Sequence, residues 1–95
     1  MNDIDGASSI NMEDLLKNID RIHTTPMGAD RIRKNLSLET DDPAKWCIEL
    51  IKSDNALIER KGKNYYITAK NCVITVNAGS FTIITAHKKR EDKNG

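Results

Sequence analysis

Two histidines are the side chains of this sequence best suited to acid–base chemistry near neutral pH. His23 follows a predicted helix, and His87 ends the last predicted strand. Because the unperturbed pKa of histidine lies near neutrality, a general acid–base site would recruit such residues first. Metal-independent RNA cleavage by attack of a 2′-hydroxyl would need this pair together with cations, for which Arg31 and Lys88 are candidates. The alternative is that each histidine only ends a secondary-structure element.

Other patterns that carry catalytic chemistry are missing from the sequence. Cys47 and Cys72 lie in apolar surroundings with no histidine nearby, so we expect buried free thiols rather than a zinc site. There is no glycine-rich phosphate loop, no serine elbow and no metal-ligand motif such as HExxH or CxxC. We therefore expect no metal and no cofactor, which leaves metal-independent chemistry or no chemistry at all.

Basic side chains gather at three places along the chain, although the formal net charge is only +1. These places are residues 31–34, 60–63 and 88–90. Acidic residues collect elsewhere, so a folded chain can present a basic face that the net charge hides. We expect a basic rim that binds nucleic acid, the alternative being solvated side chains without a partner. The expected rim residues are Arg31, Arg33, Lys34 and Lys88.

Three helices are predicted in the first half of the chain. Apolar residues recur at helical spacing after Asn11, which is a suitable N-cap. Thr25-Pro26 and Asp42-Pro43 each place an N-cap before a proline at the first helical position. The predicted helices run from about Met12 to Ile22, from Pro26 to Asn35 and from Pro43 to Lys52.

After Ser53 the apolar period changes to two, which is typical of strands. Short turns separate four such segments, and connections this short join antiparallel neighbours. The sequence therefore predicts an α+β fold with three N-terminal helices packed on a four-stranded antiparallel β-meander. We expect a single domain over residues 12–88, between a disordered tail (1–11) and a charged tail (89–95). The predicted strands are Ala56–Arg60, Asn64–Thr68, Cys72–Asn77 and Phe81–His87.

Alternation along each strand sorts its side chains into two faces of the sheet. Cys72, Ile74 and Val76 are wholly apolar, so we expect this face of the third strand to meet the helices. The opposite face is expected to be open to a ligand, and an aromatic ring there would stack on an unpaired base. The alternative is that the threonines on this face bind nothing and are only those that half-exposed sheets commonly contain. The expected binding residues on this face are Tyr66, Thr68, Thr75 and Asn77.

In the last strand, the same alternation assigns four residues to one face. These are Phe81, Ile83, Thr85 and His87.

One motif carries a family resemblance: His23-Thr24-Thr25 with Gly28, Arg31-Ile32 and Asn35-Leu36. It belongs to a longer similarity over residues 15–38, 41–42, 46–47, 60–66 (RKGKNYY) and 76–88 (VNAGSFTIITAHK). In these segments the chain resembles a family of small bacterial and phage proteins catalogued only as a domain of unknown function. The resemblance implies no activity.

A second resemblance is at the level of the fold. Helices followed by a four-stranded meander that ends in a segment such as TIITAH (82–87) are similar to the barnase–EndoU–colicin–RelE group of metal-independent ribonucleases. In that group, polar residues on the helices and the last strands form the site. The strongly basic composition common in such toxins is missing here. The resemblance implies His23, Arg31, Thr75, Thr85 and His87 as site residues.

Three classes of function are compatible with these features. We favour a non-catalytic binding or effector module, such as a phage or bacterial inhibitor or adaptor, that acts on nucleic acid or a nucleoprotein through the basic rim and the polar sheet face. The alternative is an RNase-like toxin or effector, in which His23 and His87 must share one cleft. The third is a protein that pairs with a partner or with itself through a strand edge.

The sequence gives no sign of membrane association. No apolar run approaches the roughly 18 residues needed to cross a bilayer, and the N-terminus has no apolar segment of a secretory signal. We therefore expect a cytoplasmic protein that does not bind membranes.

Overall fold

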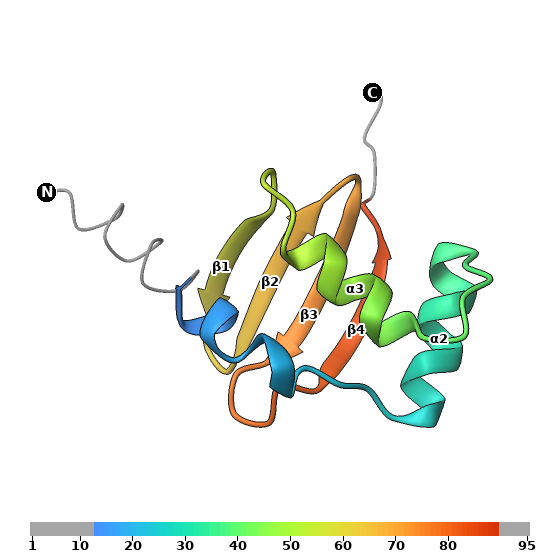
Figure 1. Ribbon diagram of the computed structural model, residues 1–95, viewed down its shortest axis with the longest axis horizontal. Helices are drawn as coiled ribbons and strands as arrows, with labels where there is room; N and C mark the ends of the chain where they lie inside the picture. The colour runs from blue at the N-terminus through green and yellow to red at the C-terminus, as the bar shows by residue number, and fades with distance from the viewer. Residues whose placement is uncertain (1–12, 90–95) are drawn as a thin grey trace, which may run out of the picture.

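The computed structural model describes residues 13–89 and has an α+β architecture (Figure 1). Residues 13–17 are helical. They are followed by the 3₁₀-helix η1 (Ile19–Arg21) and by the helices α2 (Pro26–Leu36) and α3 (Pro43–Ile51). The strands are β1 (Leu57–Lys61), β2 (Asn64–Ala69), β3 (Cys72–Asn77) and β4 (Ile83–Lys88). The α+β class and the four-stranded antiparallel sheet are thus confirmed, whereas the predicted N-cap Asn11, the tail 1–11 and all but Lys89 of the tail 89–95 lie outside the described residues.

The first predicted helix is not continuous up to Ile22. A turn at Asn18 separates residues 13–17 from η1. The Asn18 side chain donates to the carbonyl of Asp14 at 2.9 Å, and its backbone N–H bonds to Leu15 at 3.0 Å. Asparagine competes in this way for backbone groups, which tightens or ends a helix. Of the residues in the apolar pattern, Leu15 and Ile22 are buried, whereas Leu16 is 38% exposed, and the pattern did not predict the break.

The two proline-marked helix starts are confirmed. Thr25 Oγ1 accepts a hydrogen bond from the Gly28 N–H at 3.0 Å, and Asp42 Oδ1 accepts one from the Lys45 N–H at 3.1 Å. The proline that follows each cap costs nothing at a position whose N–H has no helical partner. Both helices end within one residue of the predicted ends.

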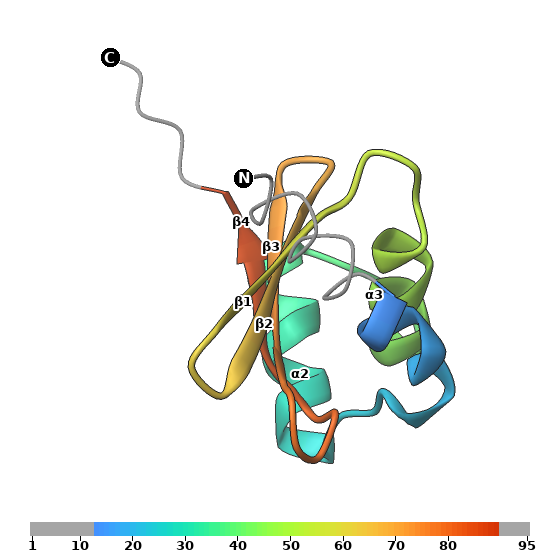
Figure 2. The ribbon, with the colours of Figure 1, turned by 90° about the vertical axis from the view of Figure 1, so that its left-hand side faces the viewer.

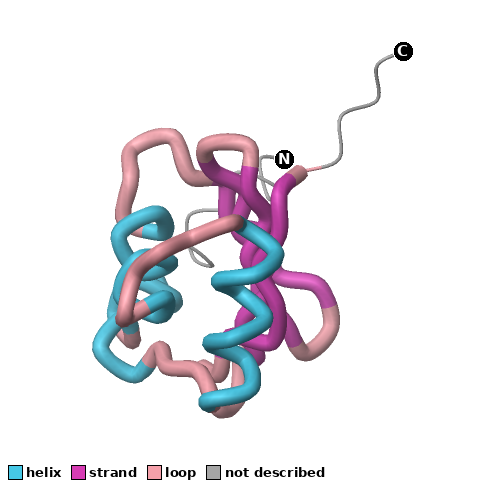
Figure 3. Tube along the Cα trace, turned by 90° about the vertical axis from the view of Figure 1, so that its right-hand side faces the viewer, coloured by secondary structure: helices cyan, strands magenta, loops and turns pink. Residues whose placement is uncertain are grey.

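The strands follow one another in the order β1-β2-β3-β4, and every pair is antiparallel. Helices α2 and α3 lie on the same side of the sheet, as the two edge views show (Figures 2 and 3). Side chains from this side of β2 and β3 form the core with the helices, and none of the described helices covers the opposite side. The core includes Ile32, Cys47, Tyr65, Ile67, Ile74 and Val76.

The register between β3 and β4 shifts by one residue. Thr75 pairs with Thr85, whereas Val76 pairs with Ile83, which leaves Ile84 as an extra residue in β4. This is a β-bulge, and strict alternation does not hold across it. Ile84 is 46% exposed, whereas the neighbouring Ile83 is 2% exposed.

The bulge corrects the predicted faces of the last strand. Ile83 shares the buried face with Ala86, whereas Thr85 and His87 lie on the other face, opposite Thr75 and Val73. Predicting one face for all four alternating residues from 81 to 87 was therefore wrong. Phe81 is not part of β4 either, since its φ of 61° lies outside the extended region.

The outer edge of β4 is covered by segments from the first half of the chain. The His23 N–H donates to the Phe81 carbonyl at 3.1 Å, and the Ile83 N–H donates to the His23 carbonyl at 2.8 Å. Further along the strand, Asn35 Nδ2 donates to the carbonyl of Ala86 at 3.2 Å. These contacts satisfy backbone groups that an edge strand otherwise leaves open.

The other edge strand, β1, is protected differently. Its last three residues, Glu59, Arg60 and Lys61, are charged and exposed. Charged side chains on an edge strand discourage pairing with another chain. Pairing of this protein through a strand edge therefore stays a prediction.

Candidate nucleic-acid interface

The side of the sheet away from the helices is a regular grid of side chains, which we call the open face. In its middle row, Tyr66 lies between Glu59 and Thr75, with Thr85 beyond Thr75. The flanking rows are Leu57, Thr68, Val73 and His87 toward one end, and Lys61, Asn64 and Asn77 toward the other. The register thus places the four predicted binding residues of this sheet on one face.

These four residues are not equally available to a ligand. Tyr66 and Thr68 are half-buried, and the Tyr66 hydroxyl accepts a hydrogen bond from Asn64 Nδ2 at 3.4 Å. Thr75 is only 7% exposed, because it lies between two occupied positions of the middle row. Asn77 shapes the following turn, since its Oδ1 accepts hydrogen bonds from Gly79 N at 2.9 Å and Ser80 N at 2.8 Å. Tyr66 and Thr68 are thus the accessible members of the set.

His23 joins the N-terminal segment to the start of β4. Its Nδ1 donates to the Arg21 carbonyl at 2.7 Å, and its Nε2 is hydrogen-bonded to Thr82 Oγ1 at 3.1 Å. The same hydroxyl lies 2.8 Å from Ser80 Oγ. Thr82 and Ser80 were not predicted as site residues, because only the tertiary fold brings them to His23.

His87 lies at the other end of the same strand. It pairs with Val73, and its Nδ1 donates to the Lys88 carbonyl at 3.0 Å. His87 lies five positions after Thr82 along nearly extended chain, which corresponds to about 15 Å. The two histidines therefore do not share the single cleft that the RNase-like alternative requires.

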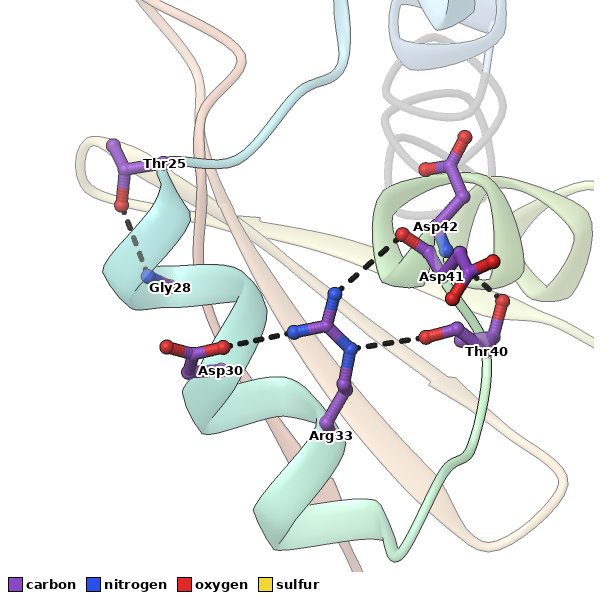
Figure 4. A network of polar contacts seen from close by, with 7 residues as sticks. All are labelled: Thr25, Gly28, Asp30, Arg33, Thr40, Asp41 and Asp42. Atoms are coloured by element: carbon purple, nitrogen blue, oxygen red, sulfur yellow. Dashed lines mark hydrogen bonds and ion pairs between the residues drawn. The ribbon is translucent and has the colours of Figure 1, made fainter.

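The predicted cations of α2 belong to the helical layer rather than to the sheet. Arg33 binds within that layer: its Nη1 pairs with Asp30 Oδ1 at 2.8 Å, and its Nε donates to the Thr40 carbonyl at 2.9 Å (Figure 4). Arg33 thus joins α2 to the segment before α3, and its predicted place in a basic rim stays a prediction. Arg31 and Lys34 are exposed on α2.

Charge is distributed unequally between the two layers. Residues 13–56 contain seven basic and nine acidic side chains, whereas the sheet and its turns contain six basic and one acidic, Glu59. The positive charge of the molecule is therefore concentrated on the sheet. Of the basic clusters at 60–63 and 88–90, only Lys88 was a predicted site residue, because the sequence alone does not assign side chains to layers. The six basic residues are Arg60, Lys61, Lys63, Lys70, Lys88 and Lys89.

A hollow of about 270 Å³ lies where the β1–β2 turn meets the β3–β4 turn. We call it the turn-end hollow, and its lining residues are Arg60, Lys63, Asn77, Ala78 and Gly79. The two turns are joined by a hydrogen bond from the Ala78 N–H to the Lys63 carbonyl at 2.8 Å. As far as the structure describes the chain, the lining contains two cations and an amide without a carboxylate, which suits an anion.

A larger cleft of about 550 Å³ lies near the N-terminal ends of α2 and α3, with Thr24, Asp41 and Lys45 among its lining residues. The caps Thr25 and Asp42 already occupy N–H groups of both first turns, and Asp41 and Asp42 are exposed. Aspartates at this position disfavour an anionic ligand. The cleft therefore does not share the chemistry of the sheet.

The cysteines are buried free thiols, as predicted. Burial, together with the neighbouring Cys72, raises the pKa of Cys47 to about 12. Burial also raises the pKa of Cys72, against the opposing effect of Lys88. Both thiols are therefore poor nucleophiles at neutral pH. Within residues 13–89, no three histidine, cysteine, aspartate or glutamate side chains are grouped to hold a metal ion.

The family described as "Protein of unknown function (DUF3781)" matches residues 16–87, a segment that spans η1, both labelled helices and nearly all of the sheet. The chain belongs to this family. The predicted membership in a family known only as a domain of unknown function is thereby confirmed. Residues of the DUF3781 segment form both the open face and the turn-end hollow.

No curated protein matches the chain. No solved structure matches it either, so the fold-level resemblance to the ribonuclease group stays a prediction. In the part of the DUF3781 chain that the structure describes, no helix has the length and apolar character of a membrane span.

Proposed function

We propose that this protein binds single-stranded nucleic acid on the open face of its sheet and does not cleave it. The observation that carries this proposal is the concentration of positive charge on the sheet. Residues 57–89 contain six basic residues and one acidic residue. Neutralisation of backbone phosphates supplies most of the affinity in nucleic-acid binding that does not depend on sequence.

The basic residues stand at both ends of the strands. Arg60, Lys61 and Lys63 lie around the β1–β2 turn. Lys70 lies in the β2–β3 turn, and Lys88 and Lys89 lie where β4 ends, which is the opposite end of the sheet. The register places Lys61 on the open face and Arg60 and Lys88 on the helix side of the sheet, whereas Lys63, Lys70 and Lys89 lie in the turns and just after β4. A nucleic-acid strand that follows the direction of the β-strands across the open face therefore meets cations at both ends of the sheet.

Tyr66 lies between these two groups and is the aromatic residue of the open face. Bases of a single strand stack on exposed aromatic rings, and this contact is tolerant of sequence. Neighbouring polar groups from Asn64 and Thr68 offer hydrogen bonds to base edges. Such a surface suits an adaptor or inhibitor that engages nucleic acid or a nucleoprotein in the cytoplasm.

We do not propose catalysis for this site. The RNase-like alternative requires His23 and His87 in one cleft, but they lie near opposite ends of β4. Both rings are also hydrogen-bonded to backbone carbonyls of neighbouring residues.

The test is a fluorescence-anisotropy titration of short RNA and DNA oligonucleotides over a range of salt concentrations. The affinity of wild type is expected to fall as the salt concentration rises. In a plot of the logarithm of the binding constant against the logarithm of the salt concentration, the slope should be about −0.7 for each phosphate contacted. Tyr66→Ala is expected to weaken binding about tenfold, since stacking contributes about 1–3 kcal/mol per base.

Charge reversal on each layer provides the matched control. Lys61→Glu, on the open face, is expected to weaken binding and reduce the salt slope, whereas Lys34→Glu, on α2, is expected to leave both nearly unchanged. Circular dichroism verifies that each variant is folded. Absence of binding at low salt, or equal effects of the two reversals, would contradict the proposal.

A further inference from the structure

We infer that the turn-end hollow binds a terminal phosphate group of the nucleic acid strand. This inference rests on the proposed function and adds to it a subsite of defined chemistry. The hollow adjoins the last row of the open face, because Asn77 belongs to both. A strand that lies along the open face therefore reaches the hollow with one of its ends.

The charge of the hollow fits a phosphate monoester. Arg60 and Lys63 contribute two positive charges, and none of the acidic residues within 13–89 lines the hollow. A terminal phosphate carries a charge of about −1.5 to −2 at pH 7, whereas an internal phosphodiester carries a single charge. Two cations that converge on one hollow therefore favour the end of a strand over its interior.

The Arg60 side chain is held in place at the hollow by contacts within the protein. Its Nε donates to the Gly62 carbonyl at 3.0 Å, and its guanidinium carbon lies 5.3 Å from the centre of the Tyr65 ring. These contacts hold the side chain, and the charge and hydrogen bonding of Arg60 lower the pKa of Tyr65 against the larger effect of burial. Among the described residues, Arg60 forms no ion pair. A fixed guanidinium group loses little conformational entropy when it binds an oxyanion.

Asp14 is an acidic residue that contacts Tyr65, the same residue over whose ring the Arg60 guanidinium lies. It accepts a hydrogen bond from the Tyr65 hydroxyl. It forms no ion pair with Arg60 or Lys63 in the part of the chain that the structure describes, and it is not part of the lining. The two cations thus stay available to a ligand.

Asn77 supplies a neutral donor beside these cations. Its Oδ1 accepts hydrogen bonds from Gly79 N, Ser80 N and Ser80 Oγ, which determines the orientation of the amide. Its Nδ2 group makes no hydrogen bond within residues 13–89. The hollow therefore combines two charged donors with one oriented amide donor, a set that matches the oxygens of a phosphate group.

The experiment compares one oligonucleotide in three forms: a 5′-phosphate, a 3′-phosphate, and hydroxyls at both ends. Wild type is expected to bind one phosphorylated form about tenfold more tightly than the hydroxyl form. Lys63→Gln and Arg60→Gln are expected to abolish this gain. Lys70→Gln removes the same charge at the opposite end of the sheet, so it should weaken all three forms equally and preserve the gain.

The outcomes separate the two proposals. If wild type binds all three forms with the same affinity, the subsite is refuted and the proposed function stands. If it binds none, the proposed function is refuted. Titration with inorganic phosphate, followed by the NMR signal of the Asn77 side-chain amide, tests the hollow without nucleic acid. We expect phosphate to shift the Asn77 side-chain amide signal in wild type and not in Lys63→Gln. An Asn77 signal that phosphate leaves unchanged in wild type would overturn the inference.

Discussion

At the scale of single residues, Gly28 is notable because its neighbour leaves no room for a side chain. A Cβ atom at this position would overlap Thr24 Oγ1, which is buried and has no hydrogen-bond partner among the described residues. The Gly28 N–H also donates to the cap Thr25. Glycine in a helix costs about 0.5–1 kcal/mol relative to alanine, so the close approach of Thr24 is the physical reason for glycine here.

We expect Gly28→Ala to lower the free energy of unfolding by about 1–3 kcal/mol, despite the better helix propensity of alanine, because overpacking outweighs it. Urea denaturation followed by circular dichroism measures the change. The control is Thr24→Ala in the same chain, which removes the overlapping hydroxyl and should restore much of the loss. A Gly28→Ala protein as stable as wild type would show that the backbone relaxes around the new methyl group.

At the scale of secondary-structure elements, Arg33 fixes α2 to the segment that leads into α3. It binds the carbonyls of Thr40 at 2.9 Å and Asp41 at 3.5 Å, as well as the carboxylate of Asp30 (Figure 4). The Asp30 side chain is 80% exposed, and exposed ion pairs contribute about 0–1 kcal/mol. The contacts to the backbone should therefore dominate.

We expect Arg33→Met to destabilise the fold by about 1–2 kcal/mol, because it keeps the apolar part of the side chain and removes the charge-assisted hydrogen bonds. Asp30→Asn, which removes only the ion pair, should cost less than about 0.5 kcal/mol. Equilibrium unfolding in urea compares the two variants. Equal losses would mean that the ion pair, and not the backbone contacts, holds the elements together.

At the scale of the whole molecule, stability is expected to be low, because a domain of this size buries a limited fraction of its surface. The loss of a proton from a buried side chain then has a measurable effect on the free energy of unfolding. The Cys47 thiol is fully buried, and burial raises its pKa from 9.0 to about 12. Burial and the hydrogen bond to Asp14 likewise raise the pKa of Tyr65, with burial as the larger cause.

The free energy of unfolding should fall as the pH rises from about 9 to about 12. In this range the unfolded chain loses the Cys47 proton while the folded chain keeps it, which costs about 1.4 kcal/mol per pH unit from this group. Urea unfolding at several alkaline pH values measures the slope. Cys47→Ala should give a shallower slope, even though its stability near pH 7 is lower. Identical slopes for both proteins would contradict a buried thiol with a raised pKa.

The sequence by itself determined what depends on local chemistry. The capped prolines set the starts of α2 and α3, and the period of two set the faces of β2 and β3, because these signals act between residues a few positions apart. It also determined membership in the family, through a similarity that extends over most of residues 16–87.

Only the tertiary structure decided what depends on contacts between distant segments. The bulge at Ile84 arises from the pairing of β3 with β4. Arg33 binds the α2–α3 connection because that connection folds back onto α2. The separation of His23 from His87, and the collection of basic side chains on one layer, follow from strand register and layer packing, which sequence periodicity does not encode. The proposed site thus keeps the polar sheet face that the sequence predicted, whereas the cations now proposed for it lie at the ends of the strands rather than on α2.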